Sequence, residues 1–504
     1  MSRRRVIMVT VGVMLSLFVA AVESTVVATA MPTIVSELGG LAFYSWVFTA
    51  YMLTSTTTVP IYGKLSDILG RKPVFMVAMA LFLTGSVLCA QSQTMGQLIA
   101  FRALQGLGAG GLMPLAFIII GDMFSFEQRA RMQGLFSGVW GVASVIGPLL
   151  GGFLVDNVSW HWVFYVNILP GVLATLLLWF GWRDPVREPG TARLPIDYAG
   201  TVVLSASVIA LLIGLTDLQS PVGIGLLALA AVLLVLLLWI ERRAADPILP
   251  LPLFKDRLFA VTAAQGVLAG WAMFGSTSFV PLFVQAVLGT SATVAGSALT
   301  PQMLGWVGAS IIGSRLLLRF GYRTIGLVGM STLVVGMFLM TRVSPDTTLL
   351  GVMFNLALMG IGMGLAMPAF LIAVQSSVQR KAMGTATATV QFSRNIGGTL
   401  GVSVMGVILS VQLAANLRAA GVVGAAATGL SIDTLLGPAG HATASPAIDN
   451  ILRIALTGAL QSVFLAALIA AVAGLAVTML APRGEVMRTR PASEAAEAEL
   501  PAVQ

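Results

Sequence analysis

The stretch Gly106-Leu-Gly-Ala-Gly-Gly-Leu-Met-Pro114 recurs 254 residues later as Gly360-Ile-Gly-Met-Gly-Leu-Ala-Met-Pro368. Both copies lie inside long apolar runs, where alternating glycines let neighbouring helices approach closely. A motif of this length that recurs so far along the chain predicts two similar halves.

Two further stretches repeat at nearly the same spacing. Gly147, Pro148 and Gly151 align with Gly397, Gly398 and Gly401 at an offset of 250. The segment 63–72 is echoed by the segment 314–323 at an offset of 251. Because the three registers agree within four residues, the halves are predicted to be parallel repeats.

Composition identifies the environment of the chain. Of its 504 residues, 57% are hydrophobic and 10% charged, and its mean hydropathy is +0.94, which indicates an integral membrane protein. The net charge of +8 comes from basic residues spread over many loops, so no nucleic-acid binding is expected. Two histidines and one cysteine, Cys89, offer no disulfide framework, metal site or catalytic cluster. We therefore expect no enzyme activity, no metal and no cofactor.

Crossing a bilayer takes about 20 residues of helix, and the apolar runs predict 14 spans. They begin near Val6, Trp46, Pro73, Gln97, Met132, Val163, Gly200, Val222, Leu258, Ala292, Thr324, Leu349, Met383 and Leu456. The predicted fold is thus an all-α membrane protein of two parallel six-helix repeats with two inserted helices.

The domain boundaries follow the connecting segments. Residues 1–182 are predicted to form the N-terminal six-helix half, and residues 183–257 the two inserted helices with cytoplasmic linkers. Residues 258–481 form the C-terminal half, and residues 482–504 a disordered cytoplasmic tail. The long outer loop at 411–450 is assigned no role. Parallel repeats place a substrate cavity between the halves, near the bilayer midplane.

Most of the 28 lysines and arginines lie in every second connection between spans. This bias is typical of cytoplasmic loops, so both termini are expected in the cytoplasm of a protein of the cell (inner) membrane. Only Arg342, Arg418 and Arg453 lie in the opposite connections. Arg102 and Arg394 lie inside spans, where a charge is costly and usually functional.

Three motifs resemble those of the major facilitator superfamily. Gly63–Lys72 resembles its loop signature after the second helix, and Arg102–Gly108 resembles its fourth-helix motif, which is associated with proton coupling. Gly141–Gly152 resembles the fifth-helix motif that marks antiporters. The resemblance implies the major facilitator fold.

Three other segments resemble the 14-helix drug:proton antiporters of that superfamily. They are Glu23–Pro32, Trp160–Asn167 and Asp246–Leu251. The first motif usually carries Asp where this chain has Glu23, which keeps the charge but lengthens the reach. The whole resemblance covers about residues 6–480.

The loop after the second span is implied to be a cytoplasmic gate that locks one conformation of the transport cycle. Its residues are Gly63, Asp67, Gly70, Arg71 and, from the end of the fourth span, Asp122. The glycines allow close approach and a tight turn, and the charges sit at helix ends. A loop that merely anchors the helices is the alternative.

The antiporter motif consists of Gly141, Gly147, Pro148, Gly151 and Gly152. Small residues let two membrane helices pack backbone to backbone, and proline permits bending. Structural packing alone would explain the pattern. Its specific form is what the resemblance links to export rather than uptake.

Glu23 and Arg102 are predicted at similar depths, since the first span runs outward and the fourth runs inward. Burial favours a protonated carboxyl and a nearby arginine favours the carboxylate, so the protonation of Glu23 can change as the cavity opens. These two residues are the predicted proton-coupling pair. A static ion pair between two helices is the alternative.

The predicted substrate cavity is lined by polar and aromatic residues within spans. They are Gln105, Trp46, Tyr51, Phe274, Gln391 and Arg394. Arg394 either binds substrate or pairs with helix carbonyls or a distant acid. Membrane aromatics more often pack or lie at the interfaces.

The sequence thus predicts a drug:H⁺ antiporter that exports lipophilic drugs or toxic compounds by alternating access. Its partners are a small lipophilic substrate, protons and the bilayer, and it is expected to be a monomer. No phosphate-binding loop is present, so ATP is not the expected energy source. An exporter of a lipid-like envelope component and a proton-coupled uptake carrier remain as alternatives.

Overall fold

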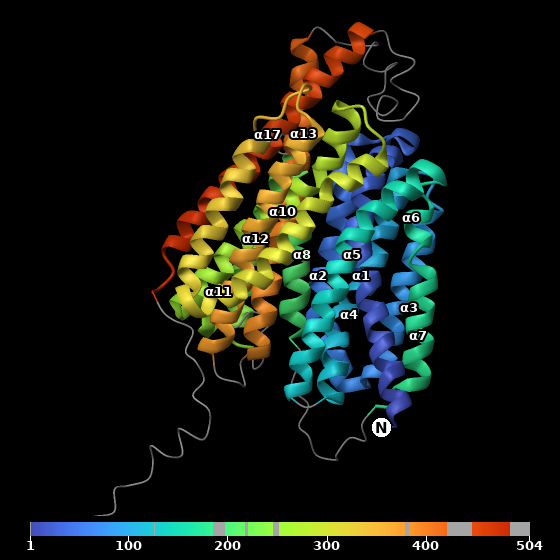
Figure 1. Cartoon of the computed structure of the whole chain (residues 1–504), viewed down its shortest axis with the longest axis vertical. Helices are drawn as coiled ribbons and strands as arrows, with labels where there is room; N and C mark the ends of the chain where they lie inside the picture. Colours follow the sequence, from blue (N-terminus) through green and yellow to red (C-terminus); the bar gives the residue numbers. More distant parts are fainter. Residues whose placement is uncertain are drawn as a thin grey trace, which may run out of the picture.

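The computed structural model describes residues 2–124, 126–184, 197–216, 220–244, 251–378, 383–420 and 446–483. Within these ranges the chain is a long bundle of helices without a β-strand (Figure 1). The end of the bundle where α1 begins is here called the base, and the opposite end the top. Nearly all of the predicted tail and most of the 411–450 loop lie outside the described residues.

The first half contains seven helices. They are α1 (Arg3–Leu38), α2 (Tyr44–Leu69), α3 (Arg71–Ala90), α4 (Met95–Met123), α5 (Phe126–Asn157), α6 (Trp162–Tyr165) and α7 (Ile168–Gly181), with the short 3-10 helix η1 (Leu41–Phe43) before α2. The short α6 and α7 together form one apolar stretch that is long enough to cross a membrane.

The remaining helices follow in the order that the repeat predicts. The inserted pair is α8 (Tyr198–Thr216) and α9 (Pro221–Glu241). The second half has η2 (Leu251–Lys255), α10 (Arg257–Leu282), the π-helix η3 (Phe283–Val287), α11 (Ala292–Met340), α12 (Leu349–Ser377), α13 (Met383–Ala419) and α17 (Pro446–Met479).

The 49-residue α11 is two spans joined at a sharp corner. Gly321 has φ 73° and ψ 160°, which interrupts the helix. Gly70, at the corner between α2 and α3, has φ 102° and ψ 156°. Only glycine adopts positive φ at little cost, so both repeats turn through an equivalent glycine, 251 residues apart.

Counting α6 with α7 once and α11 twice gives 14 spans in the described part of the chain. Eleven stretches there are long and apolar enough to cross a membrane on hydropathy alone. The other three are α2, which carries the polar run Thr54–Thr58, α8, and the first part of α11. The fold class predicted from the sequence is confirmed.

The repeated glycine motif has the same packing role in both halves. A side chain on Gly106 would meet the carbonyl oxygen of Tyr51 in α2 at 2.5 Å. Its counterpart Gly360 lies against the backbone of Gln302, in the first part of α11. Two positions further on, Gly108 faces α3, and Gly362 would meet the backbone nitrogen of Leu333, in the second part of α11, at 2.6 Å.

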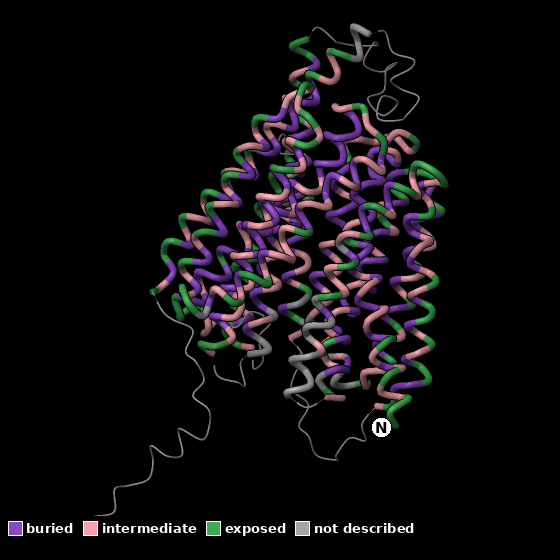
Figure 2. Tube along the Cα trace, viewed as in Figure 1, coloured by how far each residue is buried: buried purple, intermediate pink, exposed green. Residues whose placement is uncertain are grey.

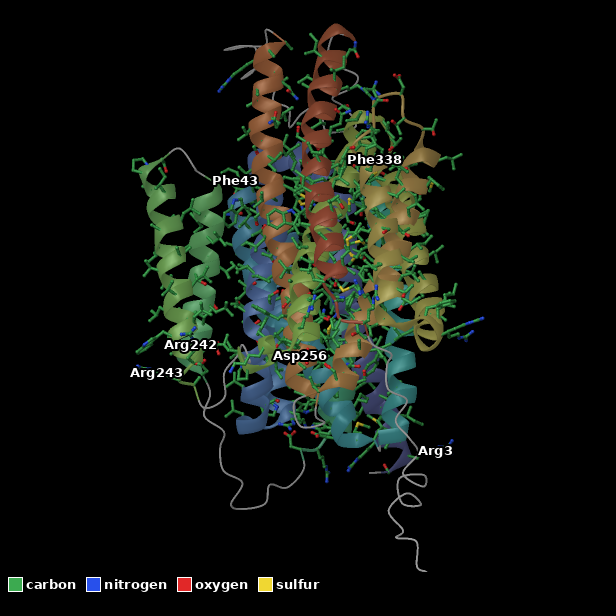
Figure 3. The ribbon with its side chains drawn as sticks, turned by 90° about the vertical axis from the view of Figure 1, so that its left-hand side faces the viewer. Arg3, Phe43, Arg242, Arg243, Asp256 and Phe338 are labelled. Atoms are coloured by element: carbon green, nitrogen blue, oxygen red, sulfur yellow. The ribbon has the colours of Figure 1, made fainter. Side chains whose placement is uncertain are left out.

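The inserted pair stands at one side of the bundle (Figure 3). Leu204 and Val208 of α8 and Leu237 of α9 form a buried cluster with Leu53 of α2. Side chains of α13, among them Phe392, pack against the same cluster. The pair therefore contacts one helix from each half.

Burial follows a pattern typical of a bilayer protein. Buried residues run through the interior of the bundle, and exposed residues lie on its outside (Figure 2). Many of the exposed side chains are large and apolar, such as Val235 at 68% and Leu350 at 77% exposure. An apolar exterior of this kind suits contact with lipid.

Gly362→Ala is expected to lower the free energy of unfolding by about 1–3 kcal/mol, because the new methyl group overpacks the backbone of α11. The measurement is the midpoint of thermal unfolding in detergent micelles. Gly308→Ala is the matched control, since nothing lies within 4 Å of a side chain there. Equal midpoints for the two variants would contradict this account of the packing.

Candidate functional site

Glu23 in α1 and Arg102 in α4 form a direct ion pair inside the first half. Their relative exposures are 0% and 2%. Nη1 of Arg102 donates to Oε1 of Glu23. The two charges that the sequence predicted at similar depth are therefore in contact, out of reach of solvent.

The second carboxylate oxygen of Glu23 is held by Asn167, at the junction of α6 and α7. Nδ2 of Asn167 donates to Oε2 of Glu23 and lies 3.1 Å from Oγ of Ser86. Ser86, in α3, in turn donates to the carbonyl oxygen of Phe164 at 2.8 Å. The short break between α6 and α7 thus places an amide beside the buried acid.

Arg102 is fixed by three further contacts. Its Nη1 donates to Oε1 of Gln105 at 2.7 Å, and its Nε to the carbonyl oxygen of Val47 at 3.3 Å. Its guanidinium carbon lies 4.1 Å from the ring centroid of Tyr51. Gln105 also donates to Ser86 at 3.2 Å, which closes the network.

This network is built for a carboxylate. Both oxygens of Glu23 accept hydrogen bonds, from Arg102 and from Asn167. Loss of the negative charge on Glu23 would weaken these charge-assisted contacts. Through its two carboxylate oxygens, Glu23 joins α1 to α4 and to the start of α7.

At the base, Arg71 joins α3 to α4. Its Nε lies 3.1 Å from Oδ2 of Asp122, and both side chains are partly exposed. Gly70 supplies the corner just before it, whereas a side chain on Gly63 would meet nothing within 4 Å. The side chain of Asp67 lies outside the described part of the structure.

Asp184, just after α7, lies at the base of the bundle and was not predicted from the sequence. Its Oδ1 accepts from the backbone nitrogens of Arg71 at 2.8 Å and Lys72 at 3.2 Å, and from Nε1 of Trp182 at 2.8 Å. A carboxylate at a helix N-terminus is favourable. Its partners Arg71 and Lys72 are 113 and 112 residues away, so no local sequence signal indicated this contact.

The glycines of α5 face helices of both halves. Gly147 and Gly151 lie against Thr25 and Thr29 of α1. Two other glycines of α5 face α11: Gly152 lies against the backbone of Thr293, and Gly141 lies near Val307. In return, Gly296 of α11 lies against the backbone of Pro148 in α5. The motif read as an antiporter signature therefore packs α5 between α1 and α11.

The halves are joined by hydrogen bonds in the upper part of the bundle. Asp156, at the end of α5, accepts from the backbone nitrogens of Ala292 at 3.1 Å and Thr293 at 2.8 Å, which begin α11. It thus supplies acceptors to two N–H groups that a helix leaves unpaired. Asp156 was not singled out from the sequence, since its partners are 136 and 137 residues away.

Three more hydrogen bonds join the halves in the same region, and together with those of Asp156 they are here called the top seal. Nε2 of Gln285 donates to the carbonyl oxygen of Thr29 at 3.0 Å, and the Tyr44 hydroxyl to that of Ser278 at 2.8 Å. The hydroxyls of Thr49 and Ser403 lie 2.7 Å apart. With Asp156, these contacts hold α1, α2 and α5 against η3, α10, α11 and α13 toward the top.

The predicted cavity residues fall into separate groups. Gln105 and Tyr51 belong to the Glu23 network. The Arg394 guanidinium lies 5.9 Å from the ring centroid of Phe274, whose ring is 6.4 Å from that of Trp306. Gln391 and Trp46 belong to neither group. Nε2 of Gln391 donates to Oδ1 of Asn395 at 3.4 Å, and Trp46 packs beside α8.

Two equivalent six-span halves, with buried charges inside one and a polar seal between them, define a multi-pass membrane transporter. The chain belongs to the Major Facilitator Superfamily, whose family model matches residues 13–402.

Relatives and solved structures agree with this assignment. The chain is 39% identical over 415 residues to the Multidrug transporter protein MdtP of Bacillus subtilis (strain 168), covering 81% of this chain and 76% of the relative. It is 37% identical over 485 residues to Multidrug resistance protein 3 of the same organism, covering 94% of each. An inward-facing, unoccupied bacterial homologue of the human lysosomal transporter Spinster shares the fold, with a TM-score of 0.70, 17% identity, and coverage of 95% and 98%.

Asn167→Leu is expected to lower the free energy of unfolding by about 1–3 kcal/mol, because it leaves a buried carboxylate oxygen without its donor. Thermal unfolding at neutral pH measures the effect. Asn157→Leu is the control, since this exposed amide bonds only the carbonyl oxygen of Phe153 in its own helix. If both variants unfold together, Asn167 does not support Glu23.

Asp156→Ala is expected to weaken the top seal by roughly 1 kcal/mol, which is about fivefold in the ratio of open to closed tops. A single cysteine in place of buried Ala286, in a Cys89→Ser background, should then react faster with a membrane-impermeant maleimide added at the top. Asn157→Ala, at the neighbouring exposed position, should leave the rate unchanged. An unchanged rate in Asp156→Ala would argue against the seal.

Proposed function

We propose that this transporter exports lipophilic drugs or toxic compounds in exchange for protons, by alternating access. The observation that carries the proposal is the buried Glu23–Arg102 pair, in which one carboxylate links three elements of the first half. The names of the two Bacillus relatives support drug-like substrates. Export rather than uptake is further supported by the glycine and proline motif of α5.

The orientation proposed places the base in the cytoplasm of a cell (inner) membrane, with both termini there. Basic residues gather at the base, where Arg3, Arg71 and Lys72 begin helices. Arg242 and Arg243 directly follow α9 at the lower end of the inserted pair (Figure 3). This distribution supports the assignment, and a sealed top then corresponds to an inward-facing state.

The moving units proposed are residues 1–182 and 258–481, with residues 183–257 as the inserted pair and 482–504 as a cytoplasmic tail. A single chain is proposed as the transport unit. The base residues Gly63, Asp67, Gly70, Arg71 and Asp122 then act as the gate that stabilises the opposite, outward-facing state. Their contacts in the first half, such as Arg71 with Asp122, support this role.

In the proposed cycle, substrate enters from the cytoplasm while Glu23 is ionised and paired with Arg102. After the top opens, a proton from outside neutralises Glu23 and weakens its contacts with Arg102 and Asn167. The loosened packing of α1 permits the return, and release of the proton inside restores the loading state. The proton and the substrate thereby act in turn on the contacts around Glu23 and Arg102.

The energy of one proton is sufficient for useful export. Moving one charge through 100 mV supplies about 2.3 kcal/mol, and one pH unit adds about 1.4 kcal/mol. For a neutral solute exchanged one for one, these support a gradient of roughly several hundred-fold.

Glu23→Gln is expected to reduce proton-driven uphill transport about 100-fold or more, because the amide cannot bind and release a proton. The assay is uptake into inside-out proteoliposomes under an imposed proton gradient, with cationic, neutral and anionic fluorescent dyes. Glu37→Gln is the control: Glu37 is on the same helix and accepts a hydrogen bond from Trp160.

Each outcome of this assay has a clear meaning. Uphill transport of any dye by the native protein, lost in Glu23→Gln and retained in Glu37→Gln, supports proton-coupled export. Native transport that survives Glu23→Gln would move the coupling to another group. An absence of native transport for every dye would contradict the proposed drug export and favour a lipid-like substrate.

A further inference from the structure

Arg394, in the second half, is a partly buried cation with one buried donor that has no partner among the described residues. It lies in α13, and its Nε is shielded from solvent with no hydrogen-bond acceptor. Its guanidinium carbon lies over the face of Phe274, 5.9 Å from the ring centroid. An isolated charge within a membrane span is costly, so its retention points to a function.

The described helices of the second half offer Arg394 no nearby acid. The sequences of α10, η3, α11, α12 and α13 contain neither aspartate nor glutamate, and in α17 the single acid is Asp449, near the top. In the first half, Glu23 is already paired with Arg102. Arg394 is therefore a positive charge that the second half does not neutralise.

Arg394 lies on the face of α13 that meets the first half. Gly398 lies one helical turn further along α13. A β-carbon at this position would lie 3.0 Å from Met52 of α2 and 3.0 Å from Phe274 of α10. Phe274 and Trp306 are only partly buried, and their rings lie 6.4 Å apart. A cation beside two aromatic rings thus faces the interface between the halves.

We propose that Arg394, Phe274 and Trp306 bind a lipophilic aromatic anion, with Arg394 on a carboxylate or sulfonate group of the substrate. This assignment of substrate class rests on the proposed export function. Guanidinium forms paired, charge-assisted hydrogen bonds with such groups. The aromatic rings supply apolar contact for the rest of the molecule.

Charge also sets the direction in which the membrane potential acts. A negative cell interior drives an anion outward and retains a cation. When a proton moves inward in exchange for an outgoing anion, both movements carry positive charge inward. Export of an anion is therefore driven twice by the potential, whereas one-for-one exchange of a cation for a proton gains nothing from it.

The test compares three pyrene probes that share one aromatic group and differ in charge. They are pyrenesulfonate, pyrenemethanol and a pyrenylmethyl trimethylammonium salt. Binding to the protein in lipid nanodiscs is followed by energy transfer from tryptophan. The native protein should bind the sulfonate about tenfold or more tightly than the neutral probe, and the cation most weakly.

Three variants separate charge recognition from general damage. Arg394→Gln should weaken sulfonate binding about tenfold and leave the neutral probe within about twofold, while Arg394→Lys should retain part of the preference. Arg342→Gln is the matched control, because this arginine also lies over a phenylalanine, Phe338, but follows the end of α11 near the top.

The failures of this inference and of the proposed function are distinguishable. Equal binding of the probes, tighter binding of the cation, or an equal loss for all three in Arg394→Gln overturns the anion site. Proton-driven transport of the cation without any preference for the anion also overturns it, but leaves the export function intact. Sulfonate binding that depends on Arg394, without proton-driven transport of any probe, supports the site and contradicts the export function.

Discussion

The buried ion pair between Glu23 and Arg102 is the constraint on which the first half depends. Charges removed from water are stable only when their remaining hydrogen-bonding groups are satisfied. Asn167 and Gln105 meet this need, and Tyr51 covers the guanidinium. Each partner requires a particular backbone: the break between α6 and α7 positions the amide, and the glycines of α4 bring α2 close enough for its tyrosine. The packing of four spans is thus organised around two charges.

The two halves share a framework but carry different chemistry. Equivalent glycines turn the chain at Gly70 and Gly321 and pack the helices alike. The first half places the Glu23 carboxylate and the Arg102 guanidinium in contact, whereas in the second half the Arg394 guanidinium lies over the ring of Phe274. On α2, Tyr51 contacts Arg102 while the adjacent Met52 lies beside Gly398, one turn from Arg394. A movement of this helix therefore reaches both groups.

The fold could be predicted because repeats and hydropathy are local properties of the sequence. The corner at Gly321 and the packing of the two glycine motifs follow from registers read along the chain. The site was only partly predictable. The charges of Glu23 and Arg102 could be singled out because they lie inside apolar spans. Asn167, however, bonds a residue 144 positions away, and Asp156 and Asp184 cap helices that are distant in sequence. Such contacts depend on helix rotation and on breaks that hydropathy does not specify.

The position of α8 makes the bundle asymmetric toward lipid. Two related halves meet along two seams, one between α2 and α13 and one between α5 and α11. The inserted helix α8 packs on α2 and α13 and covers the first seam, while the second has no equivalent cover from the inserted pair. A lipophilic molecule dissolved in the membrane thus meets two unlike flanks. One flank presents α8 to lipid and the other presents the α5–α11 seam, so the two extra spans give a pseudo-symmetric fold a handed relation to its bilayer.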